Sequence, residues 1–160
     1  MCYDGEVTTT AHLSSCPSGD ERVTLVGLLF ETNARLSRAL GAALEESCDL
    51  PLPWFDVLLQ LRRSPDGHMT MSQLADATVH STGGTTRLID RIESAGLVAR
   101  SSCPTDRRAI HVVITPAGNT VFERALTAHL EHVQVHVADR LAASERETLR
   151  ELLAKLNGDS

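Results

Sequence analysis

Residues 71–118, with the sequence MSQLADATVHSTGGTTRLIDRIESAGLVARSSCPTDRRAIHVVITPAG, contain the clearest structural pattern of the chain. The segment begins with a short helical pattern, and a tight turn leads to a second helix that Gly96 ends. A two-stranded hairpin with an arginine-rich tip follows, since Ile110, Val112 and Ile114 alternate as in a half-buried strand. Two helices joined by a tight turn are typical of a helix-turn-helix, which offers its second helix to the major groove of DNA. The segment therefore predicts DNA binding.

Local signals predict the ends and faces of these two helices. Thr70 and Gln73 fit a capping box at the start of the first helix, which should end near Thr78. Ser81 or Thr82 is expected to cap the second helix, which should run to Ala95. On this second helix the 3.6-residue period predicts an inner face of Thr85, Leu88, Ile89 and Ile92, and an outer face of Thr82, Gly83, Thr86, Arg87 and Asp90.

Helical patterns also flank this segment. Leucines at spacings of four and seven predict one long helix over residues 20–46, and a second helix is expected over residues 54–63, followed by a turn at residues 64–67. Thr115 as N-cap with Pro116 behind it predicts a fifth helix that runs to about Leu141. Ser144 is expected to cap a sixth and last helix. The chain is thus predicted to be mainly α-helical, with the hairpin as its β-structure.

The charge distribution agrees with DNA binding, although the whole chain has a formal net charge of −6. Residues 60–110 hold seven arginines against five acidic residues, a local charge of +2, and the remainder carries −8. A focused cationic surface can therefore meet phosphates despite the acidic total. The sequence has neither a long apolar run nor a secretory signal, so a cytoplasmic protein with no membrane contact is expected. Four cysteines without CxxC spacing are expected to be free thiols.

Five motifs in this order and spacing resemble the multiple-antibiotic-resistance-regulator (MarR) family of winged-helix repressors. The resemblance extends over about residues 20–157. The matching residues are Leu74-Ala75, Thr86-Arg87-Leu88-Ile89-Asp90-Arg91-Ile92-Glu93, Gly96-Leu97-Val98, Asp106-Arg107-Arg108 and Ile114-Thr115-Pro116-Ala117-Gly118.

The resemblance implies a homodimer that binds a pseudo-palindromic operator on double-stranded DNA and responds to a small, often aromatic, effector. The expected organisation is a mobile arm at residues 1–19 and one domain at residues 20–160. Within it, a winged helix-turn-helix lobe covers about residues 53–115. Helical dimerisation segments at about residues 20–47 and 116–157 complete a fold of six helices with a small hairpin wing.

The chain departs from the family pattern at two places. His80 stands at the motif turn, where the family has an apolar residue. Gly83-Gly84 replaces the serine or threonine pair early in the recognition helix, at a cost of roughly 1 kcal/mol for each glycine relative to alanine. Two interpretations remain open: the helix backbone approaches the DNA more closely, or a loose first turn becomes ordered on binding.

Side chains near the motif are the predicted DNA contacts. Arginine can read guanine bidentately in the major groove, and threonine can contact a phosphate or a thymine methyl group. In the wing, Asp106 is expected to position an arginine, and either Arg107 or Arg108 to enter the minor groove. Arg62, Arg63 and Arg91 are interpreted as salt bridges of the lobe or outlying phosphate contacts. The full predicted set is Ser81, Thr82, Gly83, Gly84, Thr86, Arg87, Arg107 and Arg108.

Effector and sensor candidates lie outside this set. An effector pocket is predicted beside Arg35, Arg38, Trp54 and Phe55, although large aromatic residues such as Trp54 and Phe55 more often belong to a core. His129, His132 and His136 share a helix face, but ligands on a second helix are missing, so no metal is expected. Cys16 and Cys103 are weak candidates for redox sensing, because the partners that would lower a thiol pKa are missing from the sequence around Cys16.

The predicted function is sequence-specific transcriptional regulation by a homodimer, without a cofactor. An enzyme is not expected, because none of the catalytic motifs considered occurs in a matching context. The alternatives are a redox- or metal-responsive regulator of the same fold, and a winged helix that serves in protein–protein contact.

Overall fold

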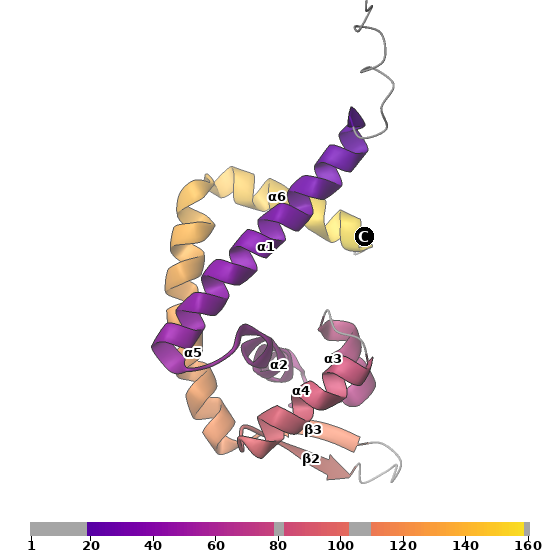
Figure 1. The fold of residues 1–160 in the computed structure, drawn as a ribbon, viewed down its shortest axis with the longest axis vertical. Helices are drawn as coiled ribbons and strands as arrows, with labels where there is room; N and C mark the ends of the chain where they lie inside the picture. The colour runs from indigo at the N-terminus through magenta and orange to yellow at the C-terminus, as the bar shows by residue number, and fades with distance from the viewer. Residues whose placement is uncertain (1–18, 79–81, 103–109, 159–160) are drawn as a thin grey trace, which may run out of the picture. The chain divides into compact units, whose positions relative to one another are not determined.

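The computed structural model describes residues 19–78, 82–102 and 110–158. The described part contains six α-helices and three β-strands (Figure 1). The chain divides into two compact units, residues 1–37 and 38–160. In chain order the elements are α1 (Glu21–Cys48), α2 (Leu52–Arg63), β1 (His68–Thr70), α3 (Met71–Ala77), α4 (Thr82–Ser94), β2 (Val98–Ser102), β3 (Ile110–Ile114), α5 (Pro116–His136), a 3-10 helix η3 (Ala138–Arg140) and α6 (Ala143–Asn157). The predicted mainly helical fold with a small hairpin is confirmed.

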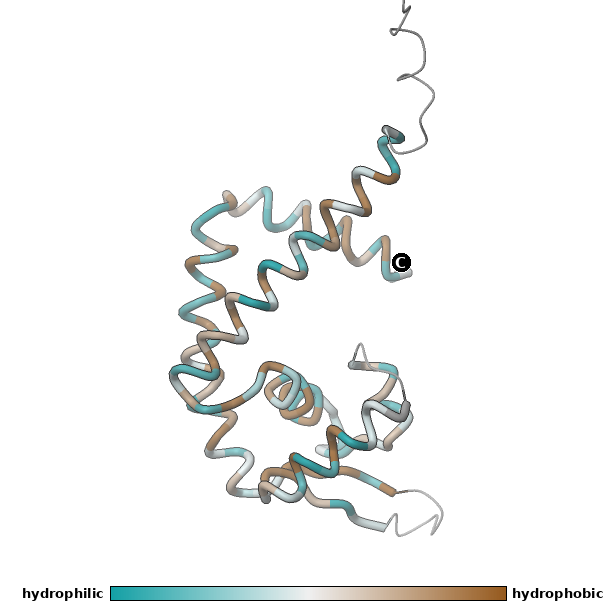
Figure 2. The backbone as a smooth tube through the Cα atoms, viewed as in Figure 1, coloured by the Kyte–Doolittle hydropathy of each residue, from teal (hydrophilic) through white to brown (hydrophobic). Residues whose placement is uncertain are grey.

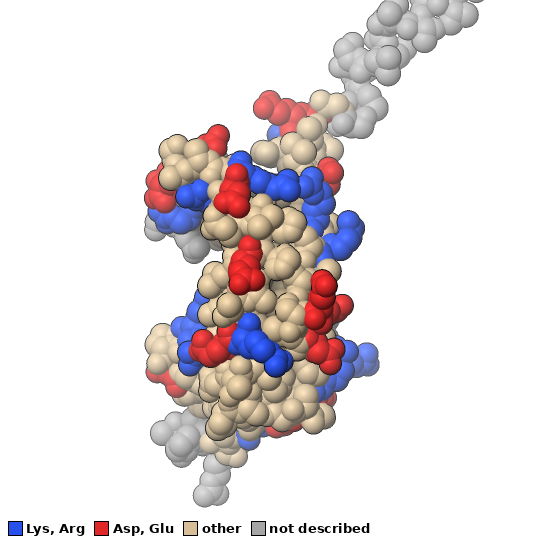
Figure 3. Space-filling view, turned by 90° about the vertical axis from the view of Figure 1, so that its left-hand side faces the viewer, with Lys and Arg blue, Asp and Glu red and all other residues tan. Residues whose placement is uncertain are grey.

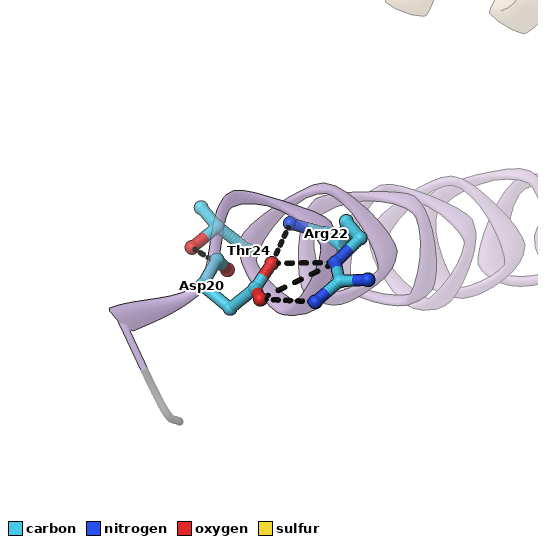
Figure 4. Close-up of polar contacts among 3 residues, drawn as sticks. All are labelled: Asp20, Arg22 and Thr24. Carbon is cyan, nitrogen blue, oxygen red and sulfur yellow. Dashed lines mark hydrogen bonds and ion pairs between the residues drawn. The ribbon is translucent and has the colours of Figure 1, made fainter. Parts of the chain in front are cut away.

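In the first unit, Asp20 caps the start of α1, close to the predicted position. Its carboxylate accepts a hydrogen bond of 2.8 Å from the backbone N–H of Arg22, and the Arg22 guanidinium donates to the same carboxylate (Figure 4). The bonds from Arg22, its side chain first, lower the pKa of Asp20 below its ordinary value. The negative charge of Asp20 also interacts favourably with the positive end of the helix dipole. This side chain therefore stabilises the start of α1 both as a cap and through its charge.

In the second unit, apolar residues from α2, α3, α4 and the sheet form one core. Phe55 is fully buried and stacks on Phe122, with 5.6 Å between the ring centroids. The predicted inner face of α4 is confirmed, because Thr85, Leu88, Ile89 and Ile92 are all buried. The other core residues include Leu44, Leu50, Val57, Leu58, Leu61, Leu74, Val98, Val112 and Ala125.

The sheet has three antiparallel strands in the order β1-β3-β2. The predicted hairpin is confirmed, and its register pairs Val98 with Ile114 and Arg100 with Val112. The strand β1 was not predicted. It is three residues long and lacks apolar alternation, so its sequence resembles a loop leading from the predicted turn.

The Ile114–Gly118 motif joins the end of the hairpin to the start of α5. The Thr115 hydroxyl accepts a hydrogen bond of 3.0 Å from the N–H of Gly118 and donates one of 2.7 Å to the carbonyl of Gly96. Gly96 has a φ of 76°, which a glycine adopts without strain. Thr115 thus caps α5, as predicted, and also anchors it to the turn after α4.

Two predicted helix ends in the C-terminal region were wrong. The helix α5 ends at His136 rather than near Leu141, and the 3-10 helix η3 follows it. Arg146 donates to the carbonyls of Ala138 and Leu141, at 2.8 and 2.6 Å, and so stabilises this corner. The helix α6 has Ala142 rather than Ser144 at its N-cap, where the Glu145 carboxylate accepts the Ala142 N–H at 2.7 Å.

Candidate nucleic-acid interface

The helix α4 is held by its inner face against α3 and the core. Thr70 and Gln73 form the predicted capping box of α3, with hydrogen bonds of 3.2 and 2.8 Å that satisfy both backbone N–H groups. Leu74 of α3 is fully buried in the same core as Leu88 and Ile89 of α4. The orientation of α4 is therefore set by packing, which leaves its other face available to a ligand.

The outer face of α4 carries the side chains predicted to contact DNA. Gly84, Thr86 and Arg87 are exposed, as are Asp90 and Arg91. The backbone of α4 is helical across the glycine pair. Thr82 begins the helix, and Ser81, like His80, lies outside the described residues.

The charges of this face are unevenly neutralised. Asp90 forms an ion pair of 2.6 Å with Arg100 of β2, and Glu93, on the neighbouring part of α4, pairs with the same arginine. Among the ion pairs of the described residues, none involves Arg87 or Arg91. As far as the structure describes the chain, the guanidinium groups of Arg87 and Arg91 are outside any ion pair, so they could meet an anionic ligand.

A shallow groove of about 710 Å³ runs along this face. Its lining combines apolar walls with two cationic groups and one carboxylate. It is bounded by Pro53, Gly84, Arg87, Leu88, Asp90 and Arg91.

Arg100 itself was missed as a functional candidate in the sequence. Its guanidinium binds both carboxylates, and its backbone N–H donates a hydrogen bond of 2.9 Å to Glu93. Two sequence periods taken together could have indicated this pairing: the two-residue period of the strand and the three-residue spacing of neighbours on a helix. Arg100 shares the inward face of β2 with buried Val98, and Asp90 and Glu93 are three residues apart on one side of α4.

The arginines that the sequence predicted outside α4 lie in other parts of the structure or beyond the described residues. Arg62 forms an ion pair of 2.8 Å with Glu123, and its guanidinium carbon lies 5.8 Å from the centre of the Phe122 ring. Arg62 thus forms a salt bridge, but its partner lies on α5, outside the predicted lobe of about residues 53–115. Asp106, Arg107 and Arg108 of the wing, and Cys103 beside them, lie outside the described residues.

The predicted effector residues are not gathered at the groove on α4. Phe55 is a core residue, as the alternative interpretation expected, and Trp54 is partly buried against the same core. Arg38 is exposed on the part of α1 that belongs to the second unit, and Arg35 is exposed in the first unit. The effector pocket stays a prediction.

The three histidines of α5 do not share one environment. His129 contacts Phe55, with ring centroids 4.6 Å apart, and its buried Nδ1 has no hydrogen-bond partner among the described residues. Burial, and secondarily the nearby His132, lower the pKa of His129. His132 and His136 stack at 6.1 Å. Among the described residues, no cluster of three or more His, Cys, Asp or Glu side chains could hold a metal ion.

On the face of the molecule shown in Figure 3, Lys and Arg side chains stand among Asp, Glu and uncharged side chains. No described helix is both long and apolar enough to cross a membrane.

Comparison with known proteins places this geometry in a family. The model of the MarR family matches residues 49–109, which include α2, α3, α4 and β2. An uncharacterised HTH-type transcriptional regulator of Bacillus cereus is 31% identical over 112 residues, covering 70% of this chain and 73% of the relative. The chain belongs to the MarR family of transcriptional regulators.

Two solved structures of similar proteins have the same fold. Sco3205, a MarR family regulator from Streptomyces coelicolor solved in complex with DNA, matches with a TM-score of 0.77 and 25% identity, covering 86% of this chain and 87% of that one. BpsR of Bordetella bronchiseptica, whose DNA binding is regulated by 6-hydroxynicotinic acid, matches with a TM-score of 0.73 and 25% identity over 84% of this chain and 98% of its own. The predicted family, and the expectation that the chain is not an enzyme, agree with these relatives, which are transcriptional regulators.

Proposed function

We propose that this MarR family member is a homodimer that binds a pseudo-palindromic operator in double-stranded DNA, and that a small molecule modulates the binding. The observation that carries the proposal is the outer face of α4. It is exposed, its acidic residue Asp90 is neutralised by Arg100, and Arg87 and Arg91 remain as cations there. A regulator of chromosomal DNA acts in the cytoplasm.

Each subunit would place α4 in a major groove. Arg87 would read guanine or contact a phosphate, and Thr86 would contact a phosphate or a thymine methyl group. The wing would lie over the adjacent minor groove, and Asp106 would position Arg107 or Arg108 there, as the sequence predicts. Ser81, Thr82, Gly83 and Gly84 would lie at the end of the helix that enters the groove.

The proposal of a second copy of the chain is based on exposed apolar residues of α6 and α1. On α6, Leu149, Leu152, Leu153 and Leu156 follow the spacing of one helical stripe, and they are 40–66% exposed. Large apolar side chains are also exposed in the first unit, where hydrophobic positions recur along α1 (Figure 2). Soluble monomers rarely expose such extended apolar stripes, so a second copy of the chain is the proposed cover. The α1 residues are Val23, Leu25, Val26, Leu28, Leu29 and Phe30.

Modulation by a ligand is proposed from the similarity to BpsR, whose DNA binding responds to 6-hydroxynicotinic acid. The effector residues predicted from the sequence are Arg35, Arg38, Trp54 and Phe55. Of these, the exposed Arg38 would supply a guanidinium group to pair with the carboxylate of an aromatic acid. Binding there would change the spacing of the two recognition helices, and therefore their fit to successive major grooves.

The binding test uses fluorescence anisotropy with the intergenic DNA next to the gene, compared with a scrambled duplex at the same salt concentration. Arg87→Ala is expected to weaken operator binding by about 1–3 kcal/mol, because a base or phosphate contact is lost. Arg140→Ala removes the same charge from the exposed 3-10 helix η3 and is the matched control, with unchanged affinity expected. Equal operator affinity of Arg87→Ala and the wild type would contradict the role of α4.

A further inference from the structure

The contact between α4 and β2 includes three hydrogen bonds from Arg100 to two acidic residues of α4. One guanidinium donates to two carboxylates that lie three residues apart on α4. The backbone N–H of the same residue donates to Glu93 as well, at 2.9 Å. The Arg100 side chain is 24% exposed, so this junction is partly shielded from water.

The geometry requires arginine in particular. A guanidinium presents its donors in a planar fork, so that Nη1 can bind Glu93 while Nη2 binds Asp90 at 2.6 Å. A lysine ammonium in this place is a compact point charge, and its three donors do not form a planar fork, so it would not reproduce the two bonds made by Nη1 and Nη2. Burial lowers the pKa of Arg100, but the hydrogen bonds to Asp90 and Glu93 outweigh it, and the net direction is upward. Arg100 therefore stays charged at any pH at which the protein is folded.

Arg100 joins two elements that are proposed to contact different grooves of the DNA: α4 the major groove, and the wing that follows β2 the minor groove. The helix α4 carries Arg87 on its exposed face. The strand β2 leads directly to residues 103–109, which contain the two predicted wing arginines. A change in the angle between α4 and β2 would therefore shift the wing contact relative to the helix contact.

The backbone pairing of β2 alone does not set this angle. The strand is paired along its length with β3, which positions it within the sheet but provides no polar bond to α4. Buried Val98 and Ile92 supply apolar contact in the core, which is non-directional. The turn between α4 and β2 has its own backbone hydrogen bonds, from the N–H of Gly96 to Glu93 and from the N–H of Leu97 to Ile92. Beyond this turn, β2 itself is hydrogen-bonded to α4 through Arg100, which donates to Asp90 and Glu93.

We propose that Arg100 is a positioning residue for operator recognition: it fixes the wing strand against the recognition helix, so that major-groove and minor-groove contacts form together. This inference rests on the proposed DNA binding. An ordinary structural ion pair in the same place would affect the stability of the fold and would leave the pattern of DNA contacts unchanged. The readout must therefore be the DNA contact pattern.

The experiment compares the wild type, Arg100→Lys and the control Arg62→Lys, in which the same substitution is made at the Arg62–Glu123 pair. Operator and scrambled duplexes are titrated at one salt concentration, and hydroxyl-radical footprints map the protected sugars. Arg100→Lys is expected to bind the operator about 10-fold more weakly, the scale of one lost base or phosphate contact. Its affinity for the scrambled duplex should remain within about twofold, since the net charge is conserved. Protection of the sugars at the minor groove beside each half-site should disappear, while protection of guanine N7 in the major groove from dimethyl sulfate should remain.

A second variant tests the junction from the helix side. Glu93→Gln retains the size of the side chain but weakens its bonds to Arg100, so the same loss of minor-groove protection is expected, even if Arg100→Lys proves unstable in thermal unfolding. Wild-type footprints from both variants, with the wild type bound to its operator, would overturn the inference and leave the proposed function intact. A wild type that protects no duplex even at low salt would overturn both.

Discussion

Gly118 shows how a single missing side chain joins two parts of this fold. A Cβ at this position would lie 2.0 Å from the backbone oxygen of Leu97 and 2.9 Å from Cγ1 of Ile114. The start of α5 thus packs directly on the chain that leaves α4, and the Thr115 hydroxyl bonds to Gly96 in the same place. The resemblance to the family pointed to this glycine, and the close approach of the two backbones explains it.

Gly118→Ala is therefore expected to destabilise the lobe by about 1–3 kcal/mol or more, because the clash involves backbone rather than a flexible side chain. Urea unfolding followed by circular dichroism measures the change. Gly41→Ala is the matched control: its new Cβ would lie 3.6 Å from Leu52, an ordinary contact, and alanine favours the helix. A Gly118→Ala protein as stable as the wild type would contradict the packing described for α5.

At the residue scale, local chemistry was predictable and contacts distant in the sequence were not. The capping residues Thr70, Gln73 and Thr115 were identified because their partners lie within three positions of them. The pairing of Arg100 was not predicted, because its two partners lie seven and ten residues away on another element. Sequence periodicity shows which face a residue occupies, but it does not show which charges on two facing elements meet.

At the scale of elements, the helices were predicted better than their ends. The inner face of α4 follows from its 3.6-residue period, and all of its predicted members are buried. The end of α5 was placed about five residues too late, because the residues after His136 are compatible with a helix. The strand β1 is too short for an alternating pattern, and its pairing with β3 depends on tertiary structure.

The packing of α5 on α2 provides a prediction about pH. His129 lies against Phe55 with its Nδ1 buried, and burial followed by His132 lowers its pKa in the folded state. The unfolded chain then takes up a proton at a higher pH than the folded protein. Stability is fully present above the unfolded pKa, near 6.5, and is lost as the pH falls below it toward the lower folded pKa.

The measurement is the free energy of unfolding at pH 7.5 and at pH 5.5, in the wild type and in His129→Leu. The wild type is expected to lose more stability between the two values than the variant, which has no imidazole at this position. His132→Leu is the control for general titration along α5 and should retain most of the wild-type pH dependence. An identical pH dependence in the wild type and His129→Leu would show that burial of His129 is not coupled to folding.

At the scale of the whole molecule, the exposed apolar residues of α1 and α6 are the basis for the proposed second copy of the chain. The long pattern over residues 20–46 predicted more helix than a small domain needs, and α1 and α6 both expose large apolar residues. The sequence could not predict whether the same chain or a second copy covers these residues, because burial within one chain and burial between two chains produce the same apolar pattern.

Leu152→Glu on α6 is expected to convert the dimer to a monomer, because a carboxylate would enter an apolar interface without a partner. Size-exclusion chromatography with light scattering measures the mass. Leu152→Met retains volume and apolar character and should remain dimeric. If Leu152→Glu has the same mass as the wild type, then the stripe on α6 lies outside the interface.

The central claim is that two chains present two copies of α4 to successive turns of one duplex. Its most direct test is a hydroxyl-radical footprint of the operator complex, with the mass of the same complex determined by light scattering. We expect two chains for each duplex and two protected half-sites about 10 base pairs apart, the spacing of one helical turn. One chain for each duplex, a single protected half-site, or no protection at low salt would contradict it.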